Sequence, residues 1–344
     1  MSDTILINLL KEYDQKRLNA ELDLERRKKN LYNLIPRLEE IDNELNSFGI
    51  NTAKNILNNS NNTQIAYTID NLKQKTEDLK KEKELILKEN NYPLDYLTPN
   101  YECKICKDSG YITDKNYHTV MCSCLKQKLI NYSINQSNLS KLDSENFNNF
   151  NEMLFSDETD LAKYKFNISP RKNILNIKNK CIEFINNFDN PEYKNLLFVG
   201  STGLGKSFMS NCIAKELLEK NKTVIYQTSS ILLEKIIKIK MNKDNKINEN
   251  NFLNSILNCD LLIIDDLGTE FLNSMTSSEL YNIINTRTLN LNKITKTIIS
   301  TNLNINEIFE RYEERIGSRI AGYYNIYYFF GDDLRFKKNR KQQF

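Results

Sequence analysis

An eight-residue glycine-rich segment restricts the possible folds of this chain more than any other feature. Residues 200–207 read Gly-Ser-Thr-Gly-Leu-Gly-Lys-Ser, which fits the pattern G-x-x-x-x-G-K-[ST]. An apolar run, 196–199, precedes this segment, and a helix-like stretch, 208–220, follows it. A strand, a loop of this pattern and a helix form the phosphate-binding loop of nucleotide-binding α/β proteins, in which backbone N–H groups surround the phosphates. The segment therefore predicts a nucleoside-triphosphate site.

All eight loop residues are candidates for nucleotide binding. Lys206 would neutralise charge on the β- and γ-phosphates, and the hydroxyl of Ser207 would ligate Mg²⁺. Three of the nine glycines in the chain fall in this loop, which indicates a backbone requirement and disfavours a chance match in a surface loop. The complete set is Gly200, Ser201, Thr202, Gly203, Leu204, Gly205, Lys206 and Ser207.

The composition is that of an ordinary soluble protein. With 344 residues, of which 40% are hydrophobic, the chain is long enough for about two domains with buried cores. We find no N-terminal export signal and no apolar run of the ~20 residues that cross a bilayer, so we expect a cytoplasmic protein without a membrane partner. A net charge of +3 is too small to indicate nucleic-acid binding by itself.

Composition shifts divide the chain into four predicted regions. Residues 1–98 form a helical or coiled-coil region, and 99–130 a cysteine-rich module. An Asn- and Ser-rich linker spans 131–169, and the nucleotide domain spans 170–344. In the last region apolar runs alternate with helical patterns, which predicts a parallel α/β sheet with its ligand at the carboxyl ends of the strands. The expected strands are 196–199, 223–227, 261–265, 297–301 and 326–330.

Apolar residues recur at helical spacing in the first region, and Pro36 and Gly49 predict breaks in it. Leu72, Leu79 and Ile86 lie seven residues apart, as in a short coiled coil or helical hairpin. Such a segment is either an arm that docks a partner or a helix pair that packs on itself, and the periodicity does not separate the two.

Two pairs of cysteines predict a structural zinc site. Cys103 and Cys106 form a C-x-x-C pair, and Cys122 and Cys124 follow after fifteen intervening residues. Four thiolates at this spacing suit a closed, tetrahedral Zn²⁺ site. Two alternatives stay open: His118, the only histidine, replaces one cysteine, or the thiols carry no metal.

Two acids end the third apolar run. Asp265 and Asp266 follow Leu-Leu-Ile-Ile at 261–264, as in a Walker B element. Asp265 would hold Mg²⁺ and Asp266 would orient or deprotonate the attacking water, because adjacent side chains at a strand end point in different directions. Asn302 ends the next apolar run, where it would sense the γ-phosphate or position water, unless it only forms an ordinary turn.

Two arginines are candidates for a contact in trans. Arg315 and Arg319 are four residues apart and share one face of a helix if their segment is helical. One or both would reach the phosphates of a neighbouring subunit, where an arginine stabilises developing charge. The alternative is a pair of solvated arginines bonded to nearby acids such as Glu310 or Glu314.

The order of these motifs resembles that of AAA+ ATPases, and specifically of the DnaC/DnaI-type replicative helicase loaders, which are similar to the IstB transposition ATPases. The resemblance covers about residues 170–340. It implies ATP hydrolysis, with Arg319 as the arginine finger, Arg315 as its helper and Arg335 as a cis contact from a sensor 2 segment. It also implies a domain without a C-terminal lid, for which the nine residues after Arg335 are too few. Asp266 departs from the glutamate of many AAA+ enzymes, and a shorter acid suits the slow hydrolysis of a switch.

The same resemblance implies a function in DNA replication. The expected partners are the hexameric replicative DNA helicase, single-stranded DNA and further copies of the chain, with ATP as an assembly switch. An ATPase partner of a transposase, like IstB, is an alternative that the cysteine module disfavours. An adaptor that only holds nucleotide is disfavoured because all the motif positions are filled.

Basic residues of 231–250 are the candidate contacts to single-stranded DNA, and a solvated basic face is the alternative. The tail after the sensor 2 segment is similarly ambiguous. The residues concerned are Lys235, Lys238, Lys240, Lys243 and Lys246 in the first segment, and Arg335, Lys337, Lys338, Arg340 and Lys341 in the second.

Overall fold

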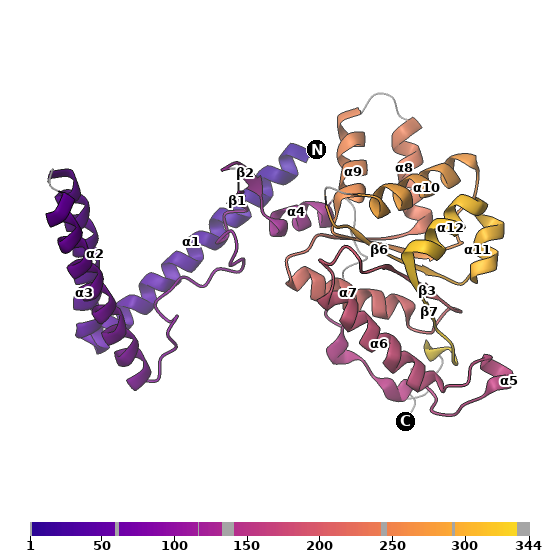
Figure 1. Cartoon of the computed structure of the whole chain (residues 1–344), viewed down its shortest axis with the longest axis horizontal. Helices are drawn as coiled ribbons and strands as arrows, with labels where there is room; N and C mark the ends of the chain where they lie inside the picture. Colours follow the sequence, from indigo (N-terminus) through magenta and orange to yellow (C-terminus); the bar gives the residue numbers. More distant parts are fainter. Residues whose placement is uncertain are drawn as a thin grey trace. The chain divides into compact units, whose positions relative to one another are not determined.

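The chain folds into two compact units, Met1–Val120 and Met121–Phe344, shown in Figure 1. The computed structural model describes residues 2–58, 62–115, 117–132, 141–241, 246–290 and 293–335. No helix within these residues is long and apolar enough to span a membrane.

Long helices form most of the described part of the first unit. α1 spans Ser2–Leu34, α2 spans Pro36–Asn58 and α3 spans Asn62–Glu89. Pro36 is the first residue of α2, where its fixed φ and missing N–H are tolerated, so the expected break at this proline is confirmed. The expected break at Gly49 is wrong, because α2 runs through this residue. A single glycine weakens a helix interior by only about 1 kcal/mol and does not end it.

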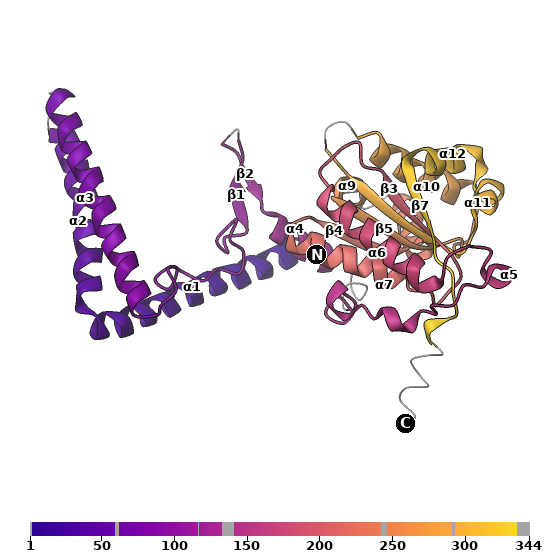
Figure 2. The ribbon, with the colours of Figure 1, turned by 60° about the horizontal axis from the view of Figure 1, so that its bottom comes forward.

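α2 and α3 pack against each other as a helical hairpin (Figure 2). Ion pairs join them: Arg37 Nε donates to Glu82 Oε1 at 2.8 Å, and Lys83 Nζ donates to Asp42 Oδ1 at 2.5 Å. Leu79 is buried, while the side chain of Leu72 lies outside the described part. The hairpin prediction is confirmed, and docking of a partner stays a prediction. A small apolar cluster at the base of the hairpin consists of Leu31, Leu38, Leu87 and Leu97.

The cysteine-rich segment forms small elements. β1 (Tyr111–Thr113) pairs with β2 (Thr119–Met121), and α4 spans Ser123–Ile130. α4 belongs to the second unit, where the side chain of Gln127 bonds the edge strand of the main sheet. Its Nε2 donates to the carbonyl oxygen of Val224 at 3.0 Å, and its Oε1 accepts from the N–H of Val224 at 2.6 Å.

A parallel sheet forms the centre of the second unit. In the described residues its strand order is β4-β5-β6-β3-β7, and each neighbouring pair is parallel. The α/β prediction is therefore confirmed, and the strands lie within two residues of the predicted runs. They are β3 (Asn195–Val199), β4 (Val224–Thr228), β5 (Leu261–Leu267), β6 (Lys296–Thr301) and β7 (Tyr324–Tyr328).

Helices cover both faces of this sheet (Figure 1). Leu196 and Phe198 of β3 face one helical layer, while Leu197 and Val199 face the other, because successive side chains of a strand point to opposite sides. Such a strand is buried on both sides and is a continuous apolar run. The first layer contains α6 (Pro170–Asn186) and α7 (Lys206–Glu219); the second contains α8 (Ser229–Met241), α9 (Lys246–Asn258), α10 (Ser274–Thr288), α11 (Ile305–Arg311) and α12 (Glu313–Tyr323).

Residues 141–155 pack on the layer of α6 and α7. They contain two short 3₁₀ turns, Phe147–Asn149 and Glu152–Leu154, and a short helix, α5 (Leu161–Tyr164), follows. Asn146 begins the first turn by accepting from two backbone N–H groups, and Phe155 is 6% exposed. The Asn-rich composition of the predicted linker did not reveal this packing.

Candidate nucleotide-binding site

The predicted phosphate-binding loop connects β3 to α7. Gly203 and Gly205 have φ values of 78° and 90°, which residues with a side chain rarely adopt. Gly203 is also required by close packing, since a Cβ atom there would lie 1.9 Å from Oδ1 of Asp333. α7 begins at Lys206, so the N–H groups of its first turn face the loop. This arrangement is the one that binds phosphate.

Lys206 is held inside the loop. Its Nζ lies 2.5 Å from the carbonyl oxygen of Gly200, 2.8 Å from that of Ser201 and 2.9 Å from Oδ1 of Asn302. Burial lowers the pKa of the ammonium, and the carboxylates of Asp266 and Asp265 oppose this shift. Asn302 therefore lies at the phosphate end of the loop, in direct contact with the lysine.

Asp265 is buried two residues before the end of β5 and accepts from three hydroxyl groups. Ser207 Oγ donates to its Oδ2 at 2.9 Å and Tyr226 OH donates to the same atom at 2.5 Å, while Ser300 Oγ donates to Oδ1. Hydroxyl and carboxylate oxygens are the ligands that Mg²⁺ prefers. The adjacent Ser207 and Asp265 therefore fit a Mg²⁺ ion beside the phosphate-binding loop.

Asp266 takes a different direction from its neighbour. Its φ of 53° is in the left-handed region, and its N–H donates to Ser300 Oγ at 3.0 Å. Desolvation and the neighbouring Asp265 carboxylate raise its pKa, against the opposing charges of Lys206 and Arg335. A carboxylate with a raised pKa is a stronger base, and this one lines the nucleotide pocket.

A cavity of about 910 Å³ adjoins the loop. Phe155, Ile174, Leu204 and Leu334 give it an apolar wall that suits a nucleobase. Sequence reasoning missed the contribution of the segment 141–155, whose residues carry no motif. Those that line the cavity are Lys141, Glu145, Asn149, Phe150, Asn151, Leu154 and Phe155.

Two contacts fix this segment over α7. Asn211 Nδ2 donates to Glu145 Oε2 at 2.6 Å, and the ring of Phe150 packs near that of Phe208, with centroids 6.3 Å apart. Lys178 of α6 places its Nζ 4.7 Å from the centroid of the Phe150 ring. The segment thus forms one wall of the cavity.

Arg335 lines the same cavity, beside the loop. The N–H of Leu334 donates to the carbonyl oxygen of Gly203 at 3.0 Å, and the N–H of Arg335 donates to Asp333 Oδ1 at 2.9 Å. These bonds place residues 333–335 against the phosphate-binding loop. The structure brings Arg335 together with the loop, Asp265, Asp266 and Asn302.

Arg315 and Arg319 are not among the residues that line the cavity in the described part of the chain. Both lie on α12, as their spacing predicts. Arg315 Nε is 2.9 Å from Glu313 Oε2, so it pairs with a nearby acid, although with neither Glu310 nor Glu314 in the contacts that we observe. The guanidinium of Arg319 lies 5.7 Å from the centroid of the Tyr323 ring.

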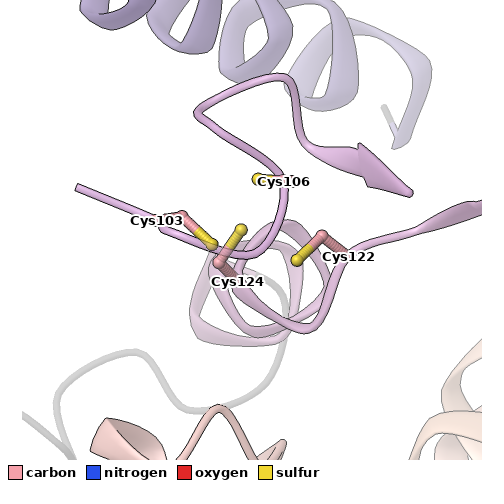
Figure 3. Close-up of side chains that lie close together, drawn as sticks. All are labelled: Cys103, Cys106, Cys122 and Cys124. Carbon is pink, nitrogen blue, oxygen red and sulfur yellow. The ribbon is translucent and has the colours of Figure 1, made fainter. Parts of the chain in front are cut away.

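The four predicted zinc ligands lie together (Figure 3). The sulfur atoms of Cys103, Cys106, Cys122 and Cys124 are all within 4.8 Å of one another. A tetrahedron with Zn–S bonds of about 2.3 Å has sulfur atoms about 3.8 Å apart, so the set fits one Zn²⁺ ion with a small contraction. Among the described residues His118 is not a member of the set, and its Nδ1 lies 3.7 Å from Asp114 Oδ2.

Asp108 organises the first pair of cysteines. This residue is 2% exposed, and its carboxylate accepts from the N–H of Glu102 at 2.9 Å and from that of Cys103 at 2.8 Å. Its φ of 55° forms part of the turn after Cys106. The second pair lies at the start of α4, where Cys122 is the residue that precedes the first helical turn. Both pairs are thus fixed by local backbone structure.

The described lysines of the expected DNA-binding segment have partners within the chain. Lys238 pairs with Glu234, and Lys240 Nζ lies 2.7 Å from Glu279 Oε1. Lys235 Nζ is 4.7 Å from the centroid of the Phe252 ring. Lys243 and four tail residues, Lys337, Lys338, Arg340 and Lys341, lie outside the described residues, as does the side chain of Lys246.

Part of the chain is similar to known proteins. Residues 173–325 match the family described as the bacterial DnaA ATPase domain. The chain is 40% identical over 78 residues to the chromosomal replication initiator protein DnaA of Helicobacter pylori strain J99. The aligned segment covers 23% of this chain and 16% of that DnaA. It is 33% identical over 88 residues to the replicative helicase loader DnaC of Buchnera aphidicola, which covers 26% of this chain and 35% of DnaC.

These matches cover well under two thirds of the length of either curated relative. A crystal structure of the DnaC helicase loader is 24% identical and covers 55% of this chain and 99% of that chain, with a TM-score of 0.43.

Proposed function

We propose that this chain, whose ATPase domain resembles those of the DnaC/DnaI-type AAA+ loaders, loads the replicative DNA helicase and uses ATP as an assembly switch. The observation that carries the proposal is the sequence match of the ATPase domain to a replicative helicase loader, beside the match to the DnaA ATPase domain. The zinc module ahead of the domain supports a loader over a transposase partner.

The proposed ATP chemistry assigns one task to each residue of the pocket. The loop N–H groups and Lys206 bind the β- and γ-phosphates, and Ser207 and Asp265 hold Mg²⁺. When bound, the ion neutralises charge on the phosphate oxygens. Asp266 accepts a proton from the attacking water. Asn302 already contacts Lys206, which supports its role as the residue that positions this water near the γ-phosphate.

Arg335 and Arg319 have separate proposed tasks. Arg335 contacts the phosphates of its own subunit, in keeping with its place in the cavity lining. Arg319, with Arg315 beside it, completes the site of a neighbouring subunit. The location of α12 apart from the cavity lining supports a contact in trans. ATP then joins two subunits, and hydrolysis separates them.

The regions outside the nucleotide site are proposed to bind the partners. We assign binding of the hexameric helicase to the helical hairpin and the zinc module, and contact with single-stranded DNA to residues 231–250. The ion pairs of Lys238 and Lys240 reduce the free positive charge of α8, so this contact should be weak and sensitive to salt. Such a contact suits a protein that leaves after loading.

Size-exclusion light scattering with the purified hexameric helicase tests the proposal. The full chain is mixed with the helicase in ATP, in ADP and without nucleotide. We expect a complex whose mass depends on the nucleotide. Absence of a complex in all three states would contradict the loader function and would favour a transposase partner or an adaptor.

A further inference from the structure

A buried carboxylate outside the nucleotide cavity lies between two functional segments. Glu270 is three residues beyond the end of β5 and is 4% exposed. It does not line the cavity in the described part of the chain. A charged side chain is costly to bury unless hydrogen bonds satisfy its oxygens. The identity of its partners therefore indicates what this residue holds in place.

The Glu270 carboxylate joins three segments. Its Oε2 accepts from the N–H of Gly268 at 3.0 Å and from Ser229 Oγ at 2.6 Å. Its Oε1 accepts from the hydroxyl of Tyr312 and lies 3.9 Å from Nε of Arg311. These partners belong to the loop after β5, to the first turn of α8 and to the junction between α11 and α12.

The loop after β5 connects Glu270 directly to the catalytic end of the sheet. Asp266 lies four residues before Glu270, and its carbonyl oxygen is 3.0 Å from Ser229 Oγ. The same oxygen accepts from Oγ1 of Thr269 at 2.9 Å. A shift of the Asp266 backbone would therefore move Ser229 and the loop that carries Glu270.

Tyr312 stands at the other end of the link. Its side chain is completely buried, and the next residue, Glu313, is the first of α12. Burial and the adjacent carboxylate raise the pKa of its hydroxyl, which therefore stays protonated and donates. Arg315 and Arg319 follow three and seven residues later, on the same helix.

Left-handed backbone conformations mark both ends of this link. Asp266 and Glu313 each have a φ of 53°, which is unfavourable for residues other than glycine. Such strained residues persist only where their surroundings hold them. The link thus connects a constrained residue of the hydrolysis site to a constrained residue at the start of α12.

We propose that Glu270 is a positioning residue that couples the end of β5 at Asp266 to α12 through Tyr312 and so sets the position of the arginine presented to the neighbouring subunit. The inference rests on the proposed role of Arg319 in trans. It adds the contacts that hold this arginine in place for hydrolysis in the next subunit.

A mixing experiment with full-length variants tests this coupling. Arg319→Ala protein retains the ATP site and lacks the finger, while Lys206→Ala protein retains the finger and binds ATP about 100-fold more weakly, so ATP is kept well below its dissociation constant. Each is inactive alone, and the mixture should hydrolyse ATP at mixed interfaces. Adding Tyr312→Phe to the Lys206→Ala finger donor should lower this rate about 10-fold, within the usual range of coupling between sites. Adding it to the Arg319→Ala protein should change the rate less than about twofold.

Tyr324→Phe in the finger donor is the matched control. Tyr324 is a buried tyrosine of the same core cluster at the opposite end of α12 and has no hydrogen bond to Glu270 among the described residues. This control should leave the rate of the mixture unchanged. Glu270→Gln in the finger donor should match Tyr312→Phe, and the two changes together should add little, because they break one link.

The outcomes separate the coupling from the function on which it rests. A starting mixture without hydrolysis would contradict the role of Arg319 in trans and the coupling that depends on it, whereas the loader function is tested separately by the complex with the helicase. A mixture that tolerates Tyr312→Phe in the finger donor would overturn the coupling alone. An equal loss from Tyr324→Phe would also overturn it, since any buried hydroxyl would then have the same effect.

Discussion

At the scale of single residues, substitutions of Lys206 and Arg319 should separate ATP binding from ATP hydrolysis. Lys206 is enclosed by loop carbonyls at the phosphate end of the cavity, whereas Arg319 lies on α12. Lys206→Ala should weaken ATP binding about 100-fold, as expected for the loss of charge-assisted bonds of about 3 kcal/mol. Arg319→Ala should retain the affinity and lose hydrolysis stimulated by self-association. Fluorescence titration measures ATP affinity and a steady-state assay measures hydrolysis, with Lys215→Ala on α7 as the control. An equal loss of ATP affinity in Lys206→Ala and Arg319→Ala would contradict the role of Arg319 in trans.

Removing the charge of Asp266 should have opposite effects on ATP hydrolysis and on the stability of the fold. Its pKa is raised in the folded protein by desolvation and by Asp265, so the folded state binds this proton more tightly than the unfolded state. Stability therefore falls as pH rises through the titration of this group, and the loss is complete above the raised pKa. Asp266→Asn removes the charge and suits the left-handed backbone, since asparagine tolerates positive φ.

We therefore expect Asp266→Asn to abolish hydrolysis and to raise the melting temperature at neutral pH. The gain should shrink as pH falls toward the range in which Asp266 itself is protonated. Thermal unfolding of both proteins between pH 4 and pH 8 measures this difference, and ATP titration shows whether the site is intact. A gain that grows at low pH would contradict the cause assigned to the shift.

At the scale of elements, Gln127 fastens α4 to the edge of the sheet. Its amide satisfies both the N–H and the carbonyl of Val224. Gln127→Leu keeps the volume and leaves these buried groups without that partner, which should cost about 1–3 kcal/mol of unfolding free energy. Urea unfolding measures the loss. Lys126→Leu, an exposed change on the same helix, should cost less than about 0.5 kcal/mol, and equal costs would show that the Gln127 bonds are not the cause.

The sequence predicted those elements that show an apolar run, a periodic pattern of apolar residues or a known motif. β3, β4, β5 and β6 were predicted because each is a largely buried run, and β7 because most of its residues are apolar or aromatic although only its first residue is buried. The loop at 200–207 was predicted because its chemistry fixes its residues. The wall formed by 141–155 was missed, since it depends on single contacts such as that of Glu145 with Asn211. The link through Glu270 was missed for the same reason: its partners are distant in the sequence, and none carries a local pattern.

At the scale of the whole molecule, the nucleotide site and the cysteine site use separate residues. None of the four cysteines lines the nucleotide cavity within the described part of the chain. A structural zinc site supplies folding free energy to the small segment that contains it, because such a segment has little apolar core of its own. Loss of the metal should therefore disrupt the cysteine module before it affects ATP binding.

The last prediction separates these two sites by experiment. Cys106→Ser should reduce the zinc content from one ion per chain toward zero and abolish the helicase complex, while ATP affinity stays within about twofold because the pocket residues are unchanged. Elemental analysis, light scattering and ATP titration measure the three quantities, and Lys104→Ala, an exposed change between Cys103 and Cys106, is the matched control. Retention of the helicase complex without zinc would assign binding to the helical hairpin alone. A parallel loss of ATP affinity would instead mean that the ATPase domain depends on the folded zinc module to bind nucleotide.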